Sequence, residues 1–478
     1  MGLKALLGGA IILGAAGGGY FYAQMQAQDY AEQAAASIKQ LVESQSAGAV
    51  VEYADVRGDA VSQIATLQGL KITDRNAPGA VLEIAELTLK GDPEQLAFFV
   101  MSDLRLSDTT QASLRAKTLR GEKIAAKDLQ TLRSLMTGDD SSELAAALGR
   151  LNTGPLALED VTIDIYGEPA GRITLGNISL GKITNGKIAQ MEWQDFLLTA
   201  EDDQLKSMEL QRATVEGLDL FYLTEETLDQ GNSNSYGISG MSLEGVSILP
   251  TGAGGSDDAF TLDLVAMEVS ERIGNLVTSN EIEIRNFVIP LSMIEQAEPL
   301  SGGMLRQMIG RDAFDVSLRI ASSLDPKSRE IQYAMTVGVD GLGKLQQEAV
   351  LGNISIEAIR RLMASPEDEE AALALFADSA LKSFSLVYDD QNLADQLLDS
   401  AGDRDQLAEL AELQLRPWLE ADQALADELV LATGNFIRKA NHFSVKVRAE
   451  NPVTLTEIPD QYASGELFSS IEVVAEGR

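Results

Sequence analysis

The sequence predicts a mainly β protein with helices, an α+β chain whose body is an elongated antiparallel sheet with an apolar groove. Apolar and polar residues alternate over many short segments between residues 49 and 356, as they do in strands with one buried face. Helical periodicity instead dominates residues 29–48 and 357–478. A run of uncharged residues at the N-terminus adds a membrane helix to this fold.

These patterns divide the 478 residues into four segments. Residues 1–28 are expected to be a membrane anchor or a signal segment, and residues 29–48 a helical stalk. Residues 49–356 form the strand-rich elongated body, with a helical insert at about 123–150. Residues 357–478 form a C-terminal α+β module that caps the body.

The N-terminal segment has the length and flanks of a membrane span. Residues 5–23 carry no charge, Lys4 precedes them, and Asp29 and Glu32 follow. This charge order predicts a single pass with the N-terminus in the cytoplasm and the body outside it. A signal peptide cleaved near Ala27 is the alternative. The residues expected in the bilayer are Leu6, Leu7, Ile11, Ile12, Leu13, Tyr20, Phe21 and Tyr22.

The body repeats a six-residue phrase: an apolar residue, any residue, then Gly, Asp or Asn, then apolar, any, apolar. It starts at Leu67, Met101, Leu158, Leu175, Trp193, Val215, Ile238, Leu243, Ile284 and Leu351. In a strand, side chains alternate between the two faces of the sheet. Strict alternation would therefore place the first apolar residue of the phrase on one face and its last two apolar residues on the other. The residue between them can therefore hold a bulge or bend where the phase switches. The alternative is that Gly and Asx turns produce this excess in any strand-rich chain.

Strands are expected at 50–53, 62–67, 70–72 and 81–89, and a strand pair at 96–101 and 104–106. Residues 291–310 suggest a short helical excursion, and 314–322 with 331–339 a hairpin. In the C-terminal module, helices are expected at 356–363, 366–381 and 393–437, the last broken near Asp403 and Pro417. Strands are expected at 383–388, 442–448 and 467–474.

The composition excludes several kinds of function. A net charge of -36 opposes binding to nucleic-acid phosphates, which depends on cationic contacts. The chain has no cysteine and a single histidine, His442, which excludes thiol catalysis, disulfides and histidine-based metal clusters. Acid pairs such as Asp389-Asp390 are typical of the solvated surface of an acidic protein. No catalytic, metal or cofactor site is expected, and the chain is predicted not to be an enzyme.

The plan of an N-terminal span and a long body of strands, with phrases such as Leu243-Glu-Gly-Val-Ser-Ile248, resembles the AsmA-like and YdgA-like proteins of Gram-negative envelopes. Residues 381–389, the following helices and residues 451–455 are similar to the tails of uncharacterised proteobacterial envelope proteins. The resemblance implies an inner-membrane protein with a periplasmic body and a bent sheet whose apolar groove carries lipid. It transfers no catalytic residue. About twenty strands stack to roughly 100 Å at most, which is short for a complete bridge between membranes.

Two functions remain open at this stage. The first is envelope maintenance by a membrane-anchored protein that binds or carries lipid on an apolar sheet face. The candidate face residues are Leu82, Ile84, Leu87, Leu89, Ile173, Leu175, Ile178 and Leu180. The competing structural explanation is that this face packs a closed core. The second function is a scaffold that binds an envelope protein through its sheet edges or acidic surface.

Overall fold

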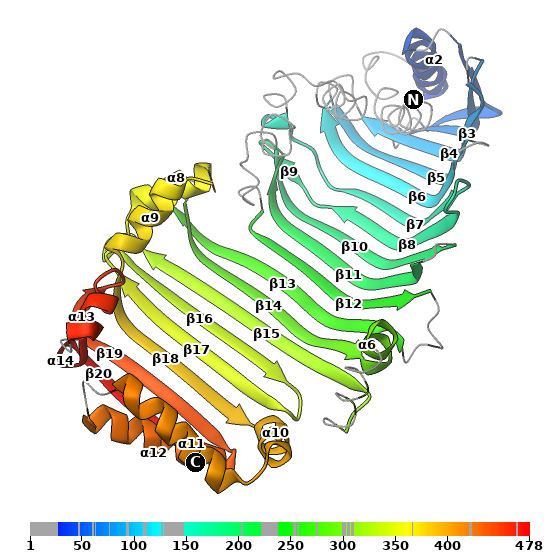
Figure 1. Ribbon diagram of the computed structural model, residues 1–478. Helices are drawn as coiled ribbons and strands as arrows, with labels where there is room; N and C mark the ends of the chain where they lie inside the picture. The colour runs from blue at the N-terminus through cyan, green and yellow to red at the C-terminus, as the bar shows by residue number, and fades with distance from the viewer. Residues whose placement is uncertain are drawn as a thin grey trace. The chain divides into compact units, whose positions relative to one another are not determined.

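The computed structural model describes residues 27–478 with gaps at 46–47, 60–61, 63, 76, 92–94, 109–111, 126–127, 129–147, 202–203, 221–237, 252–254, 256–257, 274–275, 299–302, 304–305, 307–309, 366, 420–422 and 465–466. The chain divides into two compact units, Met1–Gly252 and Ala253–Arg478. Antiparallel strands dominate each unit (Figure 1). A mainly β fold with helices is therefore confirmed.

The described part of unit 1 starts with helix α2, and an antiparallel sheet follows. Its elements are α2 (Ala27–Gln45), β1 (Ala49–Glu52), β2 (Asp55–Asp59), β3 (Ile64–Asp74), β4 (Ala77–Gly91), β5 (Gln95–Asp108), β6 (Ala112–Ala125), β7 (Leu156–Ile165), β8 (Gly171–Leu180), β9 (Ile183–Thr184), β10 (Lys187–Ala200), β11 (Leu205–Asp219) and β12 (Gly240–Pro250). Strands β1 and β2 both pair with β3, and neighbours then pair in chain order, with β10 against both β8 and β9.

Unit 2 places its helices between and after its strands. Its elements are β13 (Phe260–Ile273), β14 (Leu276–Pro290), α6 (Leu291–Ala297), β15 (Ala313–Asp325), β16 (Glu330–Val339), β17 (Gly343–Gly352), α8 (Ile356–Ala364), α9 (Glu369–Asp378), β18 (Ala380–Asp390), α10 (Leu393–Ala401), α11 (Arg404–Leu415), η3 (Arg416–Leu419), α12 (Gln423–Lys439), β19 (His442–Thr454), α13 (Ile458–Ser464), α14 (Leu467–Ser470) and β20 (Ile471–Gly477). The strands pair in chain order from β13 to β20.

A line of left-handed residues crosses the sheet of unit 1. The residues are Gly69, Asp103, Asp160, Asp195 and Gly245, on β3, β5, β7, β10 and β12, and their φ angles lie between 49° and 62°. We call them the bend row. The pairs on either side of Gly69, Gln68↔Glu86 and Leu70↔Ile84, keep one register. The strands therefore bend together without an inserted residue.

The bend row confirms the predicted role of the repeated phrase. Its third residue has a positive φ in eight of the ten phrases, and the exceptions are Asn177 and Gly240. In unit 2, Asn286 has a φ of 50° and the register between β14 and β15 shifts beside it, which is a true bulge. Gly and Asx residues suit these positions because they adopt the left-handed conformation at the lowest cost.

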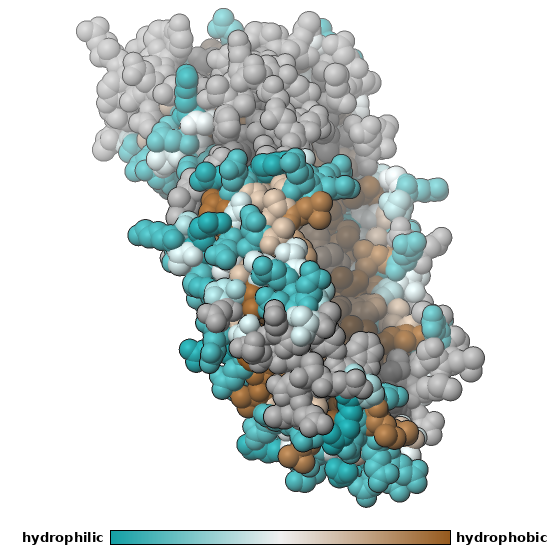
Figure 2. All heavy atoms as spheres, turned by 60° about the vertical axis from the view of Figure 1, so that its left-hand side comes forward, coloured by the Kyte–Doolittle hydropathy of each residue, from teal (hydrophilic) through white to brown (hydrophobic). Residues whose placement is uncertain are grey.

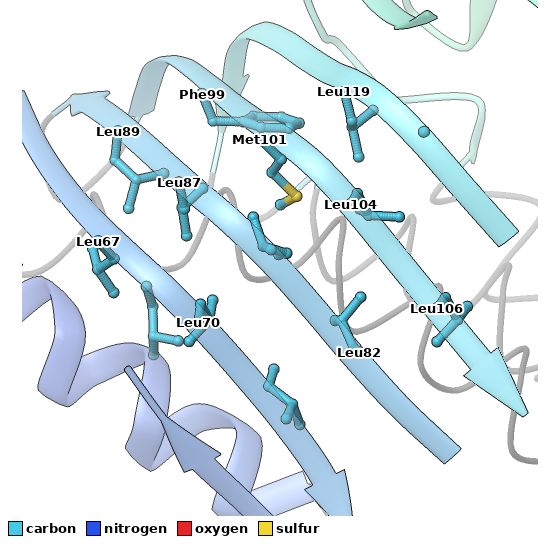
Figure 3. Packing of buried hydrophobic residues seen from close by; sticks show 14 of the residues in the cluster. Leu67, Leu70, Leu82, Leu87, Leu89, Phe99, Met101, Leu104, Leu106 and Leu119 are labelled. Atoms are coloured by element: carbon cyan, nitrogen blue, oxygen red, sulfur yellow. The ribbon is translucent and has the colours of Figure 1, made fainter. Parts of the chain in front are cut away.

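The bend keeps the apolar side chains of each long strand on one face. On β3, buried Leu67 is followed by Leu70 and not by residue 69, so strict alternation is broken once. Figure 3 shows the resulting cluster, in which side chains from β3, β4, β5 and β6 point to the same side. Helix α2 covers part of it with buried Ala35 and Ile38.

Several boundaries differ from the sequence-based predictions. Residues 64–67 of the predicted strand at 62–67 belong to one strand with residues 70–72, and residues 96–101 and 104–106 also belong to one strand. The phase switch at Gly69 and at Asp103 is therefore a bend and not a turn. Residues 123–125 of the predicted helical insert belong to β6, and most of the remainder lies outside the described residues. The predicted stalk is helix α2, which packs against β1, β2 and β3.

The C-terminal elements follow the predictions with local corrections. The break points near Asp403 and Pro417 separate α10, α11 and α12, as expected. Residues 380–381 belong to β18 and not to the preceding helix, and residues 467–470 are helical. The predicted boundary at 356–357 falls inside unit 2, where β17 pairs with β18.

Replacing Gly245 by Ala tests the bend row. A left-handed alanine costs about 1–2 kcal/mol, and its Cβ would also displace the side chain of Gln211. We expect Gly245→Ala to lower the free energy of unfolding by about 1 kcal/mol or more, and Gly245→Asn to lower it less. Urea titration of the full chain measures both.

Gly338→Ala is the matched control. Gly338 lies in β16 without a positive φ, and no atom lies within 4 Å of a Cβ built there. This variant should keep wild-type stability or gain up to about 1 kcal/mol. Equal losses for the two alanine variants would show that the left-handed conformation at residue 245 is not required.

Candidate functional site

The eight predicted face residues lie in four cross-strand rows of unit 1. Leu82 is connected to Ile173 through paired residues on β5, β6 and β7. The same pairing connects Ile84 to Leu175, Leu87 to Ile178, and Leu89 to Leu180. Sequence alternation thus selected side chains from β4 and β8 that share one face.

Burial on this face differs between its two sets of residues. Leu82, Ile84, Leu87 and Leu89 are at most 1 % exposed and belong to a closed core. Leu175 is buried too, while Ile173 and Ile178 pack against this core as half-buried residues, and Leu180 packs against a second cluster around Ile183 and Ile188. At β4 the face is therefore filled from within.

Unit 2 also has an apolar sheet face, but its side chains are less buried than those at β4. Sixteen residues on β14, β15, β16 and β17 form four rows, and each of the sixteen is half-buried. We call this the open face. Its rows are Phe287, Val316, Val339 and Gly343; Ile284, Leu318, Val337 and Leu345; Ile282, Ile320, Met335 and Gln347; and Asn280, Ser322, Tyr333 and Ala349.

No charged side chain lies in these four rows. Among the described helices of unit 2, α12 and α14 make their main strand contacts with β19 and β20, α6 with β14 and β15, and α10 with β18. Figure 2 shows brown, apolar residues gathered in a hollow between teal, hydrophilic ones. The open face is thus an uncharged apolar surface without a described helix across its centre.

Sequence reasoning recognised the hairpin of β15 and β16 but did not select its side chains. The signal was present, because Val316, Leu318 and Ile320 alternate with Ser317 and Arg319. The alternation alone does not reveal which apolar faces are covered by helices. Burial separates the closed face at β4 from the open face at β15.

Helix α12 covers the sheet of unit 2 at β19 and β20, beyond the open face (Figure 1). The open-face row that contains Leu345 continues through Tyr388 on β18 to Phe443 on β19. The ring of Phe436 lies edge-on to Tyr388 at 5.8 Å between centroids and 5.7 Å from Phe443. Tyr388 donates a hydrogen bond to Asp390 Oδ1 at 2.7 Å. Burial, followed by this bond to a carboxylate, raises the pKa of Tyr388. The hydroxyl therefore stays protonated, and Asp390 also accepts the N–H of Ala394 at the start of α10.

The opposite face of unit 2 is polar. A depression of about 420 Å³ is lined mostly by residues of this face, among them Glu268, Glu281 and Glu348. Its lining also includes one row of the open face, which is Asn280, Ser322, Tyr333 and Ala349. Arg319 donates two hydrogen bonds to Glu281, at 2.8 and 2.9 Å. These bonds lower the pKa of Glu281. Within the described residues, no three His, Cys, Asp or Glu side chains are arranged to hold a metal ion.

The single histidine lies on β19. His442 Nδ1 is 2.6 Å from Asp389 Oδ1 on the paired strand β18. Among the described residues, no serine or threonine hydroxyl is hydrogen-bonded to this pair, and the two residues face each other on paired strands.

The predicted anchor residues, Leu6 to Tyr22, lie outside the described residues. None of the described helices combines the length and apolar character that crossing a bilayer requires.

A family model described only as an uncharacterized protein matches residues 336–475, from β16 to β20. The search of curated proteins found no match. The matched segment includes the last four residues of β16, all of β17 and the helices that follow.

Phe436→Ala tests the packing of α12 on the apolar face. Phe436 is half-buried between two aromatic rings, so we expect the free energy of unfolding to fall by about 2 kcal/mol. Leu431→Ala on the same helix is the control, because Leu431 is 62 % exposed and should change stability by less than about 0.5 kcal/mol. Chemical denaturation compares them, and similar losses would contradict this packing.

Proposed function

We propose that this chain is a membrane-anchored, non-enzymatic protein of the bacterial envelope that binds lipid acyl chains on the open face. The single observation that carries the proposal is an uncharged, half-buried sheet face with no described helix over its centre. Soluble proteins rarely leave large contiguous apolar surface exposed unless it binds something. An acyl chain fits because it covers apolar side chains without needing a charged partner.

The sequence supports the location in this proposal. Residues 5–23 are uncharged and long enough to span a bilayer, with Lys4 before them. The proposed topology is a single pass through the inner membrane, with the body in the periplasm. Lipid handling there would contribute to envelope maintenance, as the resemblance to AsmA-like proteins implies.

The alternative function is a scaffold that adds a partner strand at a sheet edge. The outer strand β20 offers limited support for it, because Glu428 on α12 accepts the backbone N–H of Ala475 at 2.8 Å. An edge N–H already bonded to a carboxylate is a poorer template for another strand. The lipid proposal is therefore preferred.

A charge placed on the open face tests the proposal. Met335 faces the open side of β16, and a glutamate there would have to be desolvated under an acyl chain. We expect the purified full-length chain to retain phospholipid, and Met335→Glu to retain at least tenfold less. Mass spectrometry of organic extracts measures lipid per chain.

Thr336→Glu is the matched control, since Thr336 is the next residue and pairs with Arg319 on the opposite face. It should retain lipid at the wild-type level. A wild-type chain that is monodisperse and free of lipid would contradict the proposal. So would equal lipid loss in the two variants.

A further inference from the structure

One row of the open face is polar in its first three positions. Asn280 on β14 pairs with Ser322 on β15, and Ser322 pairs with Tyr333 on β16. We call these three residues the polar row. Neighbouring strands lie about 4.8 Å apart, so the row spans roughly 10 Å. Gln347 on β17 lies in the adjacent row, diagonal to Tyr333.

The hydrogen bonds within the polar row leave donors unused. The Ser322 hydroxyl donates to Asn280 Oδ1. Among the described residues, the Asn280 amide N–H groups, the Tyr333 hydroxyl and the Gln347 side chain have no hydrogen-bond partner. All of them are half-buried on an otherwise apolar surface. Covering a polar group with a ligand that offers it no hydrogen bond costs free energy. A ligand on this face should therefore supply hydrogen-bond acceptors.

The lack of charged side chains in the four rows restricts what those acceptors can be. A phosphate placed over the polar row would be desolvated with no cation in the four rows to pair with it. An ester carbonyl is uncharged and accepts hydrogen bonds from amide and phenol donors. Asn280 and Tyr333 lie two strands apart with Ser322 between them, so the two ester groups of one acylglycerol have to reach across Ser322 to meet both donors.

We propose that the polar row binds the ester carbonyls of an acylglycerol, with Asn280 and Tyr333 as the donors; this rests on the proposed function. The acyl chains lie over the three apolar rows. A charged headgroup, where the lipid has one, lies beyond the face. The ligand class is therefore defined by its ester region and chains.

Two probes that differ only in these carbonyls test the inference. Dipalmitoylglycerol has two esters, and dihexadecylglycerol has ether links and no carbonyl. The full-length chain is offered equal amounts of both in detergent, re-isolated, and the bound lipids are quantified by mass spectrometry. We expect the wild type to favour the diester by about fivefold, the scale of one or two net hydrogen bonds.

The double variant Asn280→Leu, Tyr333→Phe should bind the two probes almost equally while keeping its affinity for the diether. That retained affinity shows that the variant is folded. Tyr333→Phe alone, which removes one oxygen, should lose part of the preference. The control Ser279→Ala, Gln332→Leu changes the same two strands on the opposite face and should keep the fivefold preference.

The outcomes separate the two claims. Equal binding of both probes by the wild type, or an unchanged preference in the double variant, would overturn the role of the polar row and leave the proposed function standing. A wild type that binds neither probe would contradict the proposed function itself.

Discussion

The fold of unit 1 depends on one constraint: each long strand must change the parity of its alternation at the bend row and still keep its apolar residues on one face. The bend row meets this constraint with left-handed residues on alternate strands. The strands between them contribute residues such as Lys117 and Gln211, and the pairs on either side keep their register. A bend on one strand alone would shift half of its side chains to the wrong face.

A sheet with one apolar face is stable in water when that face is packed against other parts of the chain or covered by a ligand. In unit 1, α2 and the packed side chains of β3, β4, β5 and β6 bury theirs almost completely. In unit 2, α12 covers the face beside β19 and β20, and the residues in the four rows on β14–β17 are half-buried. The polar side, with ion pairs such as Arg319 to Glu281, stays in water, where such pairs contribute little to stability.

Much of this fold could be predicted from the sequence, because alternation and Gly or Asx residues act locally. The phrase at Leu158-Glu-Asp-Val identified both a strand and its bend, and Asp160 is left-handed there. The sequence could not separate a bend from a turn at Asp103, since both favour the same residue types. The sequence also could not show that Leu87 is fully buried while Leu318 is only half-buried. That difference depends on where helices pack, which alternation does not encode.

Photocrosslinking tests the central claim most directly. A phospholipid with a photoreactive group at the end of an acyl chain is bound to the full-length chain and irradiated, and the adducts are mapped by mass spectrometry. The account predicts adducts at every second residue of β15, on Val316, Leu318 and Ile320, with few on Ser317 or Arg319. Equal labelling of consecutive residues, or adducts confined to the exposed leucines of α11, would contradict an acyl-binding open face.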